Sequence, residues 1–378
     1  MPIVSKSGYI IKDVYNDLMS SMETKNYVRT CHLTAELICS NELKTLTNWI
    51  ISVLSNKYIG TNSFLLQFLN DRLMILRDEG FKWKNDIVRM AVCDMFLILS
   101  KENMTTTIFY KPTGYTKDIK HHIEQLYFSP QKHFVELQDN LAYVVENEIF
   151  QLICYLYEHM LKNDIKTVFK IMYFVLQKKT IDECETLDIV RDIKKYTNDP
   201  VWLLWKLLFI YASRPPTNPY TQSYIQNAFD IFKFEYNRKI RDERLNLLFV
   251  CYIICVRRKA VSYHDTYDDF ISKASNKIGI VYDEILEIET EQKKMRKAKE
   301  QEDKTQMKEK KKGLLDPEAQ KALDEKMKYL YVLTYKKQKE PVYNKTDSSV
   351  ANFPLKILDV PSLSDEKGRG KSLNLIKM

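Results

Sequence analysis

Histidine is the residue from which a metal site would first be sought, and the histidines gather at one place in the chain. His121, His122 and His133 lie close in sequence to Glu124, and imidazole and carboxylate groups are common zinc ligands. Adjacent residues on a helix point about 100° apart, so His121 and His122 do not easily reach one ion. Because no cysteine lies nearby in sequence, we predict a solvated loop here, with no metal and no cofactor.

Cysteine chemistry is the second possibility. Cys251 and Cys255 are four residues apart and would share one face of a helix, but the surrounding residues are apolar, which is typical of small core residues. Cys31 precedes His32, with Cys39 further on, yet adjacent helical residues do not face each other and no third group orients the histidine. We predict core positions here. The odd total of seven cysteines, the absence of a CxxC pair and the absence of a signal peptide predict an intracellular, reducing compartment.

Other patterns of enzyme chemistry are missing from the sequence. Paired carboxylates such as Glu146 and Glu148 do not indicate acid–base catalysis, because such pairs are common in a chain that is 29% charged. Neither GxGxxG nor GxxxxGK[ST] occurs, and there are only 8 glycines, which disfavours standard nucleotide-binding enzymes. The four tryptophans lie on apolar stripes, so we interpret them as core residues and not as stacking platforms for bases. We predict no catalytic residues.

A basic segment is the feature most typical of a binding function. Residues 291–312 carry much of the chain's formal charge of +8 and have the composition of an arm that binds phosphates. The acidic residues interspersed in it are typical of a solvated charged helix, and both readings stay open. The candidate nucleic-acid-binding residues are Lys293, Lys294, Arg296, Lys297, Lys299, Lys308, Lys310, Lys311 and Lys312, with Lys304 in the same segment.

The elements that would carry these residues are helices. The low glycine content argues against β-sandwiches and barrels, while 45% hydrophobic residues provide ample core. Residues 43–77 read as a helical hairpin, with apolar residues recurring at helical spacing in both arms. Gly60 is expected to end the first arm in the left-handed conformation, and Thr61, Asn62 or Ser63 to cap the second.

Two further stretches define the expected layout. Residues 201–210 are apolar nearly all round, which predicts a central helix, and this run and the one at 245–256 are too short to span a membrane. Residues 104–116 have strand-like composition and are interpreted as an extended surface crossover. Residues 180–196 are expected to form a more polar helix, with Leu187, Val190 and Ile193 facing inward.

A resemblance rests on two segments, LKTLTNWIISVLSNKYIGTNSFLLQFLNDRL (residues 43–73) and WLLWKLLF (residues 202–209). These segments, with the Lys-, Asn-, Ile- and Tyr-rich composition, resemble an uncharacterised helical protein family of large cytoplasmic DNA viruses. The resemblance covers about half of the chain, includes no catalytic motif and carries over no functional residue. It implies a viral setting, in the host cytoplasm (the virus factory) or in the virion.

Taken together, these patterns predict an all-α protein of stacked helical hairpins, either an irregular array or a two-lobed bundle. The expected division is an N-terminal helical subdomain (1–116), a second helical subdomain (117–288), a charged helical extension (289–340) and a disordered tail (341–378). The predicted function is a non-catalytic scaffold or protein-interaction protein with a protein partner and no membrane span. The alternative is a nucleic-acid-associated accessory factor of replication or transcription that binds phosphates through residues 291–312.

Overall fold

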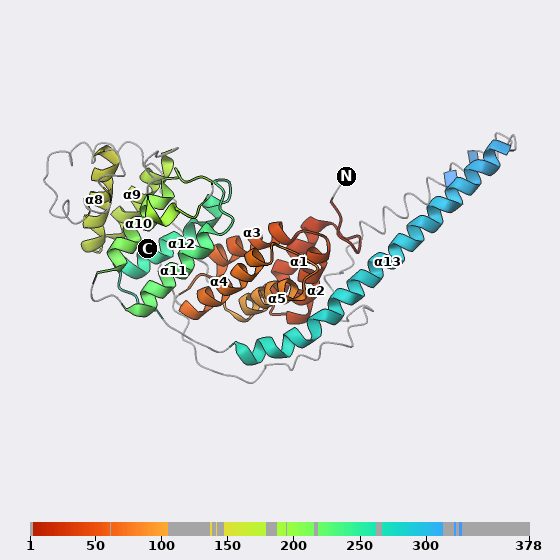
Figure 1. The fold of residues 1–378 in the computed structure, drawn as a ribbon, viewed down its shortest axis with the longest axis horizontal. Coiled ribbons are helices and arrows are strands. Elements are labelled where there is room, and N and C mark those ends of the chain that lie inside the picture. Colours follow the sequence, from red (N-terminus) through yellow and green to blue (C-terminus); the bar gives the residue numbers. More distant parts are fainter. Residues whose placement is uncertain are drawn as a thin grey trace. The chain divides into compact units, whose positions relative to one another are not determined.

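The protein is all-α, as predicted. The computed structural model describes residues 3–60, 62–104, 147–178, 187–193, 195–214, 218–261 and 267–312, with isolated positions at 137, 141, 321–322 and 325–326 (Figure 1). The described residues contain no β-strand; an isolated antiparallel bridge joins Val4 and Ile10. The strand-like residues from 105 on, the histidine cluster and the predicted tail lie outside the described residues.

The helices group into two compact units, each assembled from segments distant in sequence. The first comprises Met1–Leu46, Lys82–Lys101 and the described part of Asp269–Arg369, and the second comprises Thr47–Phe81 and the described part of Glu102–Asp268. The predicted boundary at residue 116 lies outside the described residues. The predicted boundary at residue 288 falls inside one continuous helix, and the predicted division into subdomains stays a prediction.

The first unit is built from α1 (Ile11–Glu23), α2 (Tyr27–Cys39), α5 (Asp86–Lys101) and the first half of α13 (Asp268–Lys312). In α1 the buried residues Val14, Leu18 and Met22 repeat every four positions, so they form one stripe, and α1 packs against both α2 and α5. Helix α2 is buried over most of its circumference and is therefore the centre of this unit.

The second unit contains α4 (Ser63–Asp78), α8 (Asn147–Leu161), α9 (Ile165–Gln177), α10 (Val201–Ala212), α11 (Pro219–Lys233) and α12 (Arg241–Val256). Helix α10 packs against α8, α9, α11 and α12, and its tryptophans Trp202 and Trp205 are fully buried. The prediction that the apolar run at 201–210 forms a central helix is confirmed. Among the described helices, none is both long enough and apolar enough to cross a membrane.

Both helices predicted for the hairpin at residues 43–77 are present, with differences at the turn between them. Helix α3 (Leu43–Val53) continues into a π-helical turn, Leu54–Tyr58, that packs against α12. Asn62 caps α4 by accepting a hydrogen bond from the Phe64 amide at 3.1 Å, as expected of one of the three candidate caps. Gly60 was expected to be left-handed and is not, because extended Ile59 ends the π-helical turn.

Two other turns are informative. Gly80 ends α4 with a φ of +64°, a conformation that costs glycine little, and its amide donates to the Arg77 carbonyl at 3.0 Å. The helix predicted over residues 180–196 is wrong for its described part, because residues 188–190 form a single 3-10 turn. Of its three predicted inner positions, Leu187 and Val190 are buried and Ile193 is half-buried.

Candidate functional site on helix α13

Helix α13 begins as a packed element of the first unit. It is 45 residues long, which corresponds to about 67 Å at 1.5 Å per residue. The described buried side chains in its first half are Phe270, Ile271, Val281, Tyr282 and Ile285. The Phe270 ring packs edge-on against Tyr27 of α2, with 4.9 Å between ring centroids. This burial fixes the helix to the body of the unit.

Tyr282 is the largest of the nearly inaccessible anchoring residues. Its side chain is 1% exposed, and the Arg89 guanidinium lies over its ring, 4.6 Å from the centroid. Burial, together with the neighbouring thiols of Cys93, Cys39 and Cys31, raises the pKa of the Tyr282 hydroxyl well above its ordinary value. The hydroxyl therefore stays neutral, and within the described residues it has no hydrogen-bond partner.

A second anchor lies near the middle of α13, where the N-terminal segment reaches the helix. The carboxylate of Glu289 accepts from the ammonium groups of Lys6 and Lys293, each at 2.7 Å. These two hydrogen bonds, the one from Lys293 first, lower the pKa of Glu289. Gln292 adds a hydrogen bond to the Ser7 carbonyl at 3.0 Å.

The N-terminal segment is itself held by α2. Glu36 is fully buried and accepts from both the amide and the hydroxyl of Ser7, at 2.8 and 2.7 Å. The amide of Lys6 donates to the Ser40 hydroxyl at 2.9 Å. A buried carboxylate is stable only when it is hydrogen-bonded, so these donors explain why Glu36 is found in the core. The chain Glu36–Ser7–Gln292 thus links α2 to α13.

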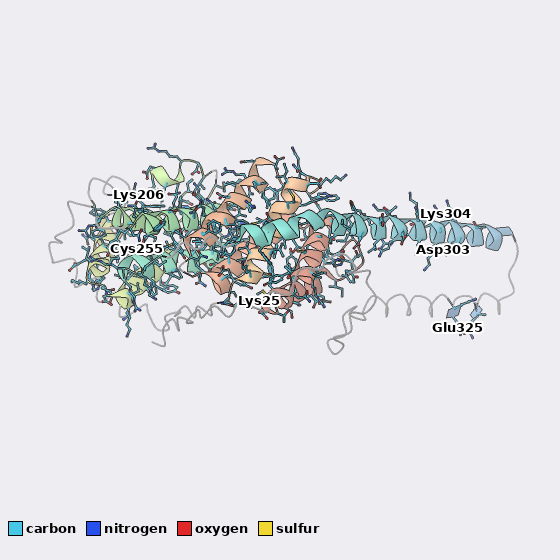
Figure 2. All side chains as sticks on the ribbon, turned by 90° about the horizontal axis from the view of Figure 1, so that it is seen from below. Lys25, Lys206, Cys255, Asp303, Lys304 and Glu325 are labelled. Carbon is cyan, nitrogen blue, oxygen red and sulfur yellow. The ribbon has the colours of Figure 1, made fainter. Side chains whose placement is uncertain are left out.

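Beyond this anchor, α13 is exposed. From Thr290 to Thr305 every side chain is exposed except those of Gln292 and Asp303, which are half-buried. Met295, the largest apolar side chain in this stretch, is 68% exposed. Figure 2 shows Asp303 and Lys304 standing out from the ribbon on this part of the helix. Because no apolar stripe is present, the stretch is not the seam of a coiled coil.

The sequence-predicted basic residues all fall on this helix. Lys293, Lys294, Arg296, Lys297 and Lys299 are exposed on its described surface, and Lys304 lies a turn further on. Lys308, Lys310, Lys311 and Lys312 belong to the last turns of α13, but their side chains lie outside the described residues. Lys293 has a second role that the sequence did not reveal, because it holds Glu289 and so contributes to the anchor.

The other candidate groups are structural where the structure describes them. Cys251 and Cys255 are buried in α12, as predicted, and burial raises the pKa of the Cys255 thiol to about 12 (Figure 2). Cys31 and Cys39 are buried, and burial lowers the pKa of His32. Among the described residues, no group of three or more His, Cys, Asp or Glu could hold a metal ion.

The tryptophans divide between two environments. Trp202 and Trp205 pack against Phe229 and Phe232 in an aromatic cluster between α10 and α11, so the core interpretation is confirmed for them. Trp49 and Trp83 are half-buried, so the core interpretation is not confirmed for them. The cationic groups of Lys84 and Arg89 lie over the Trp83 ring. Such cation–π contacts stabilise a half-buried ring.

Sequence reasoning missed two buried charge networks in the second unit. Asp199 is fully buried and accepts from the Tyr236 hydroxyl at 2.9 Å and from Arg238 and Arg241, each at 3.3 Å. It also caps α10 through the Val201 amide at 3.1 Å. The sequence signal was only the helix start at Asn198-Asp199-Pro200, which does not reveal partners some forty residues further on.

The second network surrounds Arg244, which is 1% exposed. Its guanidinium donates to the carbonyls of Phe232 and Phe234 at 2.8 and 2.6 Å and to the side-chain oxygen of Asn48 at 2.8 Å. These carbonyls form the C-terminal end of α11, which carries partial negative charge. The arrangement closes the α11–α12 hairpin and ties it to α3, so we assign it a structural role.

Comparison with known proteins adds no relative. No protein-family model matches the chain, and neither a curated protein nor a solved structure does. The resemblance to a viral family, based on residues 43–73 and 202–209, therefore stays a prediction. The site on α13 has to be interpreted from its own geometry.

Proposed function

We propose that the protein is a non-catalytic interaction protein, a scaffold that presents the exposed half of α13 to a protein partner. The observation that carries the proposal is that one uninterrupted helix is anchored through Tyr282 and Glu289 and then exposes residues 290–305. A charged helix of this length has little stability of its own, since most helices depend on packing. The anchor supplies a packed start from which the helix can extend.

The chemistry of the remaining candidate groups supports a non-catalytic role. The described cysteines are buried and form no disulfide. Burial raises the pKa of the thiols of Cys39, Cys154, Cys251 and Cys255, so these thiols stay protonated and are poor nucleophiles. The carboxylate of Asp199 is engaged by Tyr236 and two arginines, and the imidazole of His159 joins α8 to the cap of α9 through Asp164, 3.0 Å away. These groups hold helices together.

The proposal is tested by affinity capture with the full chain and with a variant that lacks residues 290–312. We expect the full chain to retain a protein in stoichiometric amount after nuclease treatment, and the deletion variant to lose it. A variant that lacks residues 341–378 keeps α13 whole and serves as the control. Equal retention by the full chain and the 290–312 deletion would show that α13 is not the interaction surface.

A second candidate is a nucleic-acid-associated accessory factor, favoured by the exposure of Lys294, Arg296, Lys297, Lys299 and Lys304 on the same stretch. Lysine and arginine bind phosphate groups, and such binding weakens steeply as salt rises. Captured nucleic acid that is released by salt and lost on deletion of 289–315 would favour this candidate over the scaffold.

The setting of either function is also a proposal. The resemblance of residues 43–73 and 202–209 to helical proteins of large cytoplasmic DNA viruses supports a viral replication compartment or particle, within a reducing intracellular environment. Immunofluorescence of an infected cell, with the protein at sites of viral DNA synthesis, would support that setting, and a uniform distribution in uninfected cells would contradict it.

A further inference from the structure

The charges on the exposed half of α13 are segregated by face. Successive residues of a helix are turned by about 100°, so positions in the sequence translate into positions around the axis. Over residues 290–312, about one third of the circumference carries seven lysines and no acidic residue. We call this third the basic face. Its lysines are Lys293, Lys294, Lys297, Lys304, Lys308, Lys311 and Lys312.

The rest of the circumference has the opposite balance. It carries Arg296, Lys299 and Lys310 together with five acidic residues, Glu291, Glu300, Glu302, Asp303 and Glu309. The net charge of +5 over the segment is therefore +7 on the basic face and −2 on the remainder. A count of charges along the sequence does not reveal this division. The acidic residues alternate with basic ones in the sequence, but on the helix they lie outside the basic face.

The basic face runs straight along the helix axis. Lys293 and Lys304 are eleven residues apart, as are Lys297 and Lys308, and eleven residues are almost a whole number of turns. The row from Lys293 to Lys311 spans about 27 Å. Within the described residues, Lys294, Lys297 and Lys304 form no ion pair, and Lys293 alone has one, with Glu289. Lys294, Lys297 and Lys304 are thus uncompensated on their own face.

We propose that the basic face binds the phosphate backbone of nucleic acid without reading its sequence. This inference rests on the second candidate function above. A nucleic acid strand presents one negative charge per about 3.4 Å, so it offers several phosphates to a row of this length. Lysine is a point charge that contacts phosphate without the planar fork by which arginine recognises guanine. Phosphate contacts position a protein on nucleic acid and carry no sequence information.

The composition of the same stretch disfavours an anionic membrane as the partner. A helix that lies in a membrane surface needs an apolar face opposite its basic one. Within residues 290–305 the apolar residues are Met295 and Ala298, and the surface opposite the basic face carries Lys299, Glu302 and Asp303. Such a helix gains little from burial in lipid.

The test compares two triple variants of the full chain that remove the same charge from different faces. The basic-face variant is Lys297→Gln/Lys304→Gln/Lys308→Gln. The control is Arg296→Gln/Lys299→Gln/Lys310→Gln, which takes the three basic residues off the other side. Glutamine is a good helix former, so α13 should persist in both, and equal far-UV circular dichroism verifies this. A third variant, Lys297→Arg/Lys304→Arg/Lys308→Arg, keeps the charge and should bind like the full chain.

Binding is measured by fluorescence anisotropy as a function of salt, with a labelled mixed-sequence duplex DNA and its single strand as probes. We expect the basic-face variant to reduce the slope of log K against log salt by about 2.7 on duplex or about 2.1 on single strand. The control should change it by less than about 1. The probe with the tighter binding identifies the form of nucleic acid, and a second duplex of different sequence should bind equally.

Three results would overturn the inference: equal losses in the two triple variants, no binding of either probe by the full chain, or tighter binding to phosphatidylserine vesicles or an acidic peptide. These outcomes are separable from failure of the proposed function. If α13 is not an interaction surface, deletion of 290–312 leaves every captured partner in place. If only the basic face is wrongly assigned, that deletion removes a partner while the two triple variants behave alike.

Discussion

Replacing the buried arginine of the second unit should destabilise it, and the structure allows the size of the effect to be worked out. Arg244 makes three hydrogen bonds from a charged donor, to Phe232, Phe234 and Asn48. At about 1.5–3 kcal/mol each, they contribute about 4.5–9 kcal/mol. Arg244→Met keeps most of the apolar stem but leaves these three acceptors without a donor.

Desolvation opposes this stabilisation. Burial lowers the pKa of Arg244 to about 10, which corresponds to a cost of about 3 kcal/mol for the charged form. The Nε atom has no hydrogen-bond partner within the described residues, which costs about 1–3 kcal/mol more. The centres of these ranges favour the arginine by about 2 kcal/mol, and we expect Arg244→Met to lower the free energy of unfolding by about 2 kcal/mol at neutral pH.

The assay is urea unfolding followed by tryptophan fluorescence, since Trp202 and Trp205 are buried in the same unit. Lys239→Met, which removes an exposed charge from the loop before α12, is the matched control and should change stability by less than about 0.5 kcal/mol. An Arg244→Met protein that is as stable as the parent, or more stable, would refute the reasoning. It would mean that the cost of burying the guanidinium exceeds the contribution of its three hydrogen bonds.

Two predictions concern the first unit. Tyr282→Phe removes a buried hydroxyl that lacks a partner among the described residues, so it should stabilise the unit by about 1 kcal/mol, whereas Tyr282→Ala should cost about 3–5 kcal/mol. Hydrogen exchange at the slowest amides of α2, which belongs to the same unit, measures both. A loss of stability in the phenylalanine variant would indicate an unseen hydrogen bond. Glu289→Gln should weaken the hold on the N-terminal segment by less than about 1 kcal/mol, seen as faster hydrogen exchange at residues 5–11. Because the pKa of Glu289 is lowered in the folded protein, its contribution is present above the ordinary glutamate pKa of about 4.3 and is lost as pH falls through the folded value. A difference in protection between the parent and Glu289→Gln at these amides that stays the same from neutral to acid pH would contradict this.

The sequence predicted the helices best where apolar residues repeat strongly or fill the whole circumference. Residues 201–210 and 245–256 are so apolar that burial on all sides was the only stable solution, and α10 and α12 are buried accordingly. The turn at Gly80 was equally predictable, because glycine takes a positive φ readily. Gly60 offered the same signal, but the π-helical turn at Leu54–Tyr58, fitted against α12, had already ended the helix.

For the candidate site, the sequence predicted the basic composition but not the three-dimensional arrangement. Residues 291–312 were recognised as basic, and the structure adds that they continue a packed helix whose start lies more than twenty residues earlier. The anchor could not be predicted, because it depends on Lys6, Ser7 and Glu36, which lie far away in sequence. Asp199 and Arg244 were missed for the same reason: their charges are compensated by groups that only the tertiary structure brings near.

The continuity of α13 has a consequence for how its surface can change. No proline and no glycine interrupts the helix between Tyr282 and Lys312, so the helix is continuous from the buried tyrosine to the last lysine. Insertion of a single uncharged residue after Glu289 would turn the rest of the helix by about 100° around its axis and would leave the net charge unchanged. The number of residues between Tyr282 and each lysine therefore determines on which side of the helix that lysine lies.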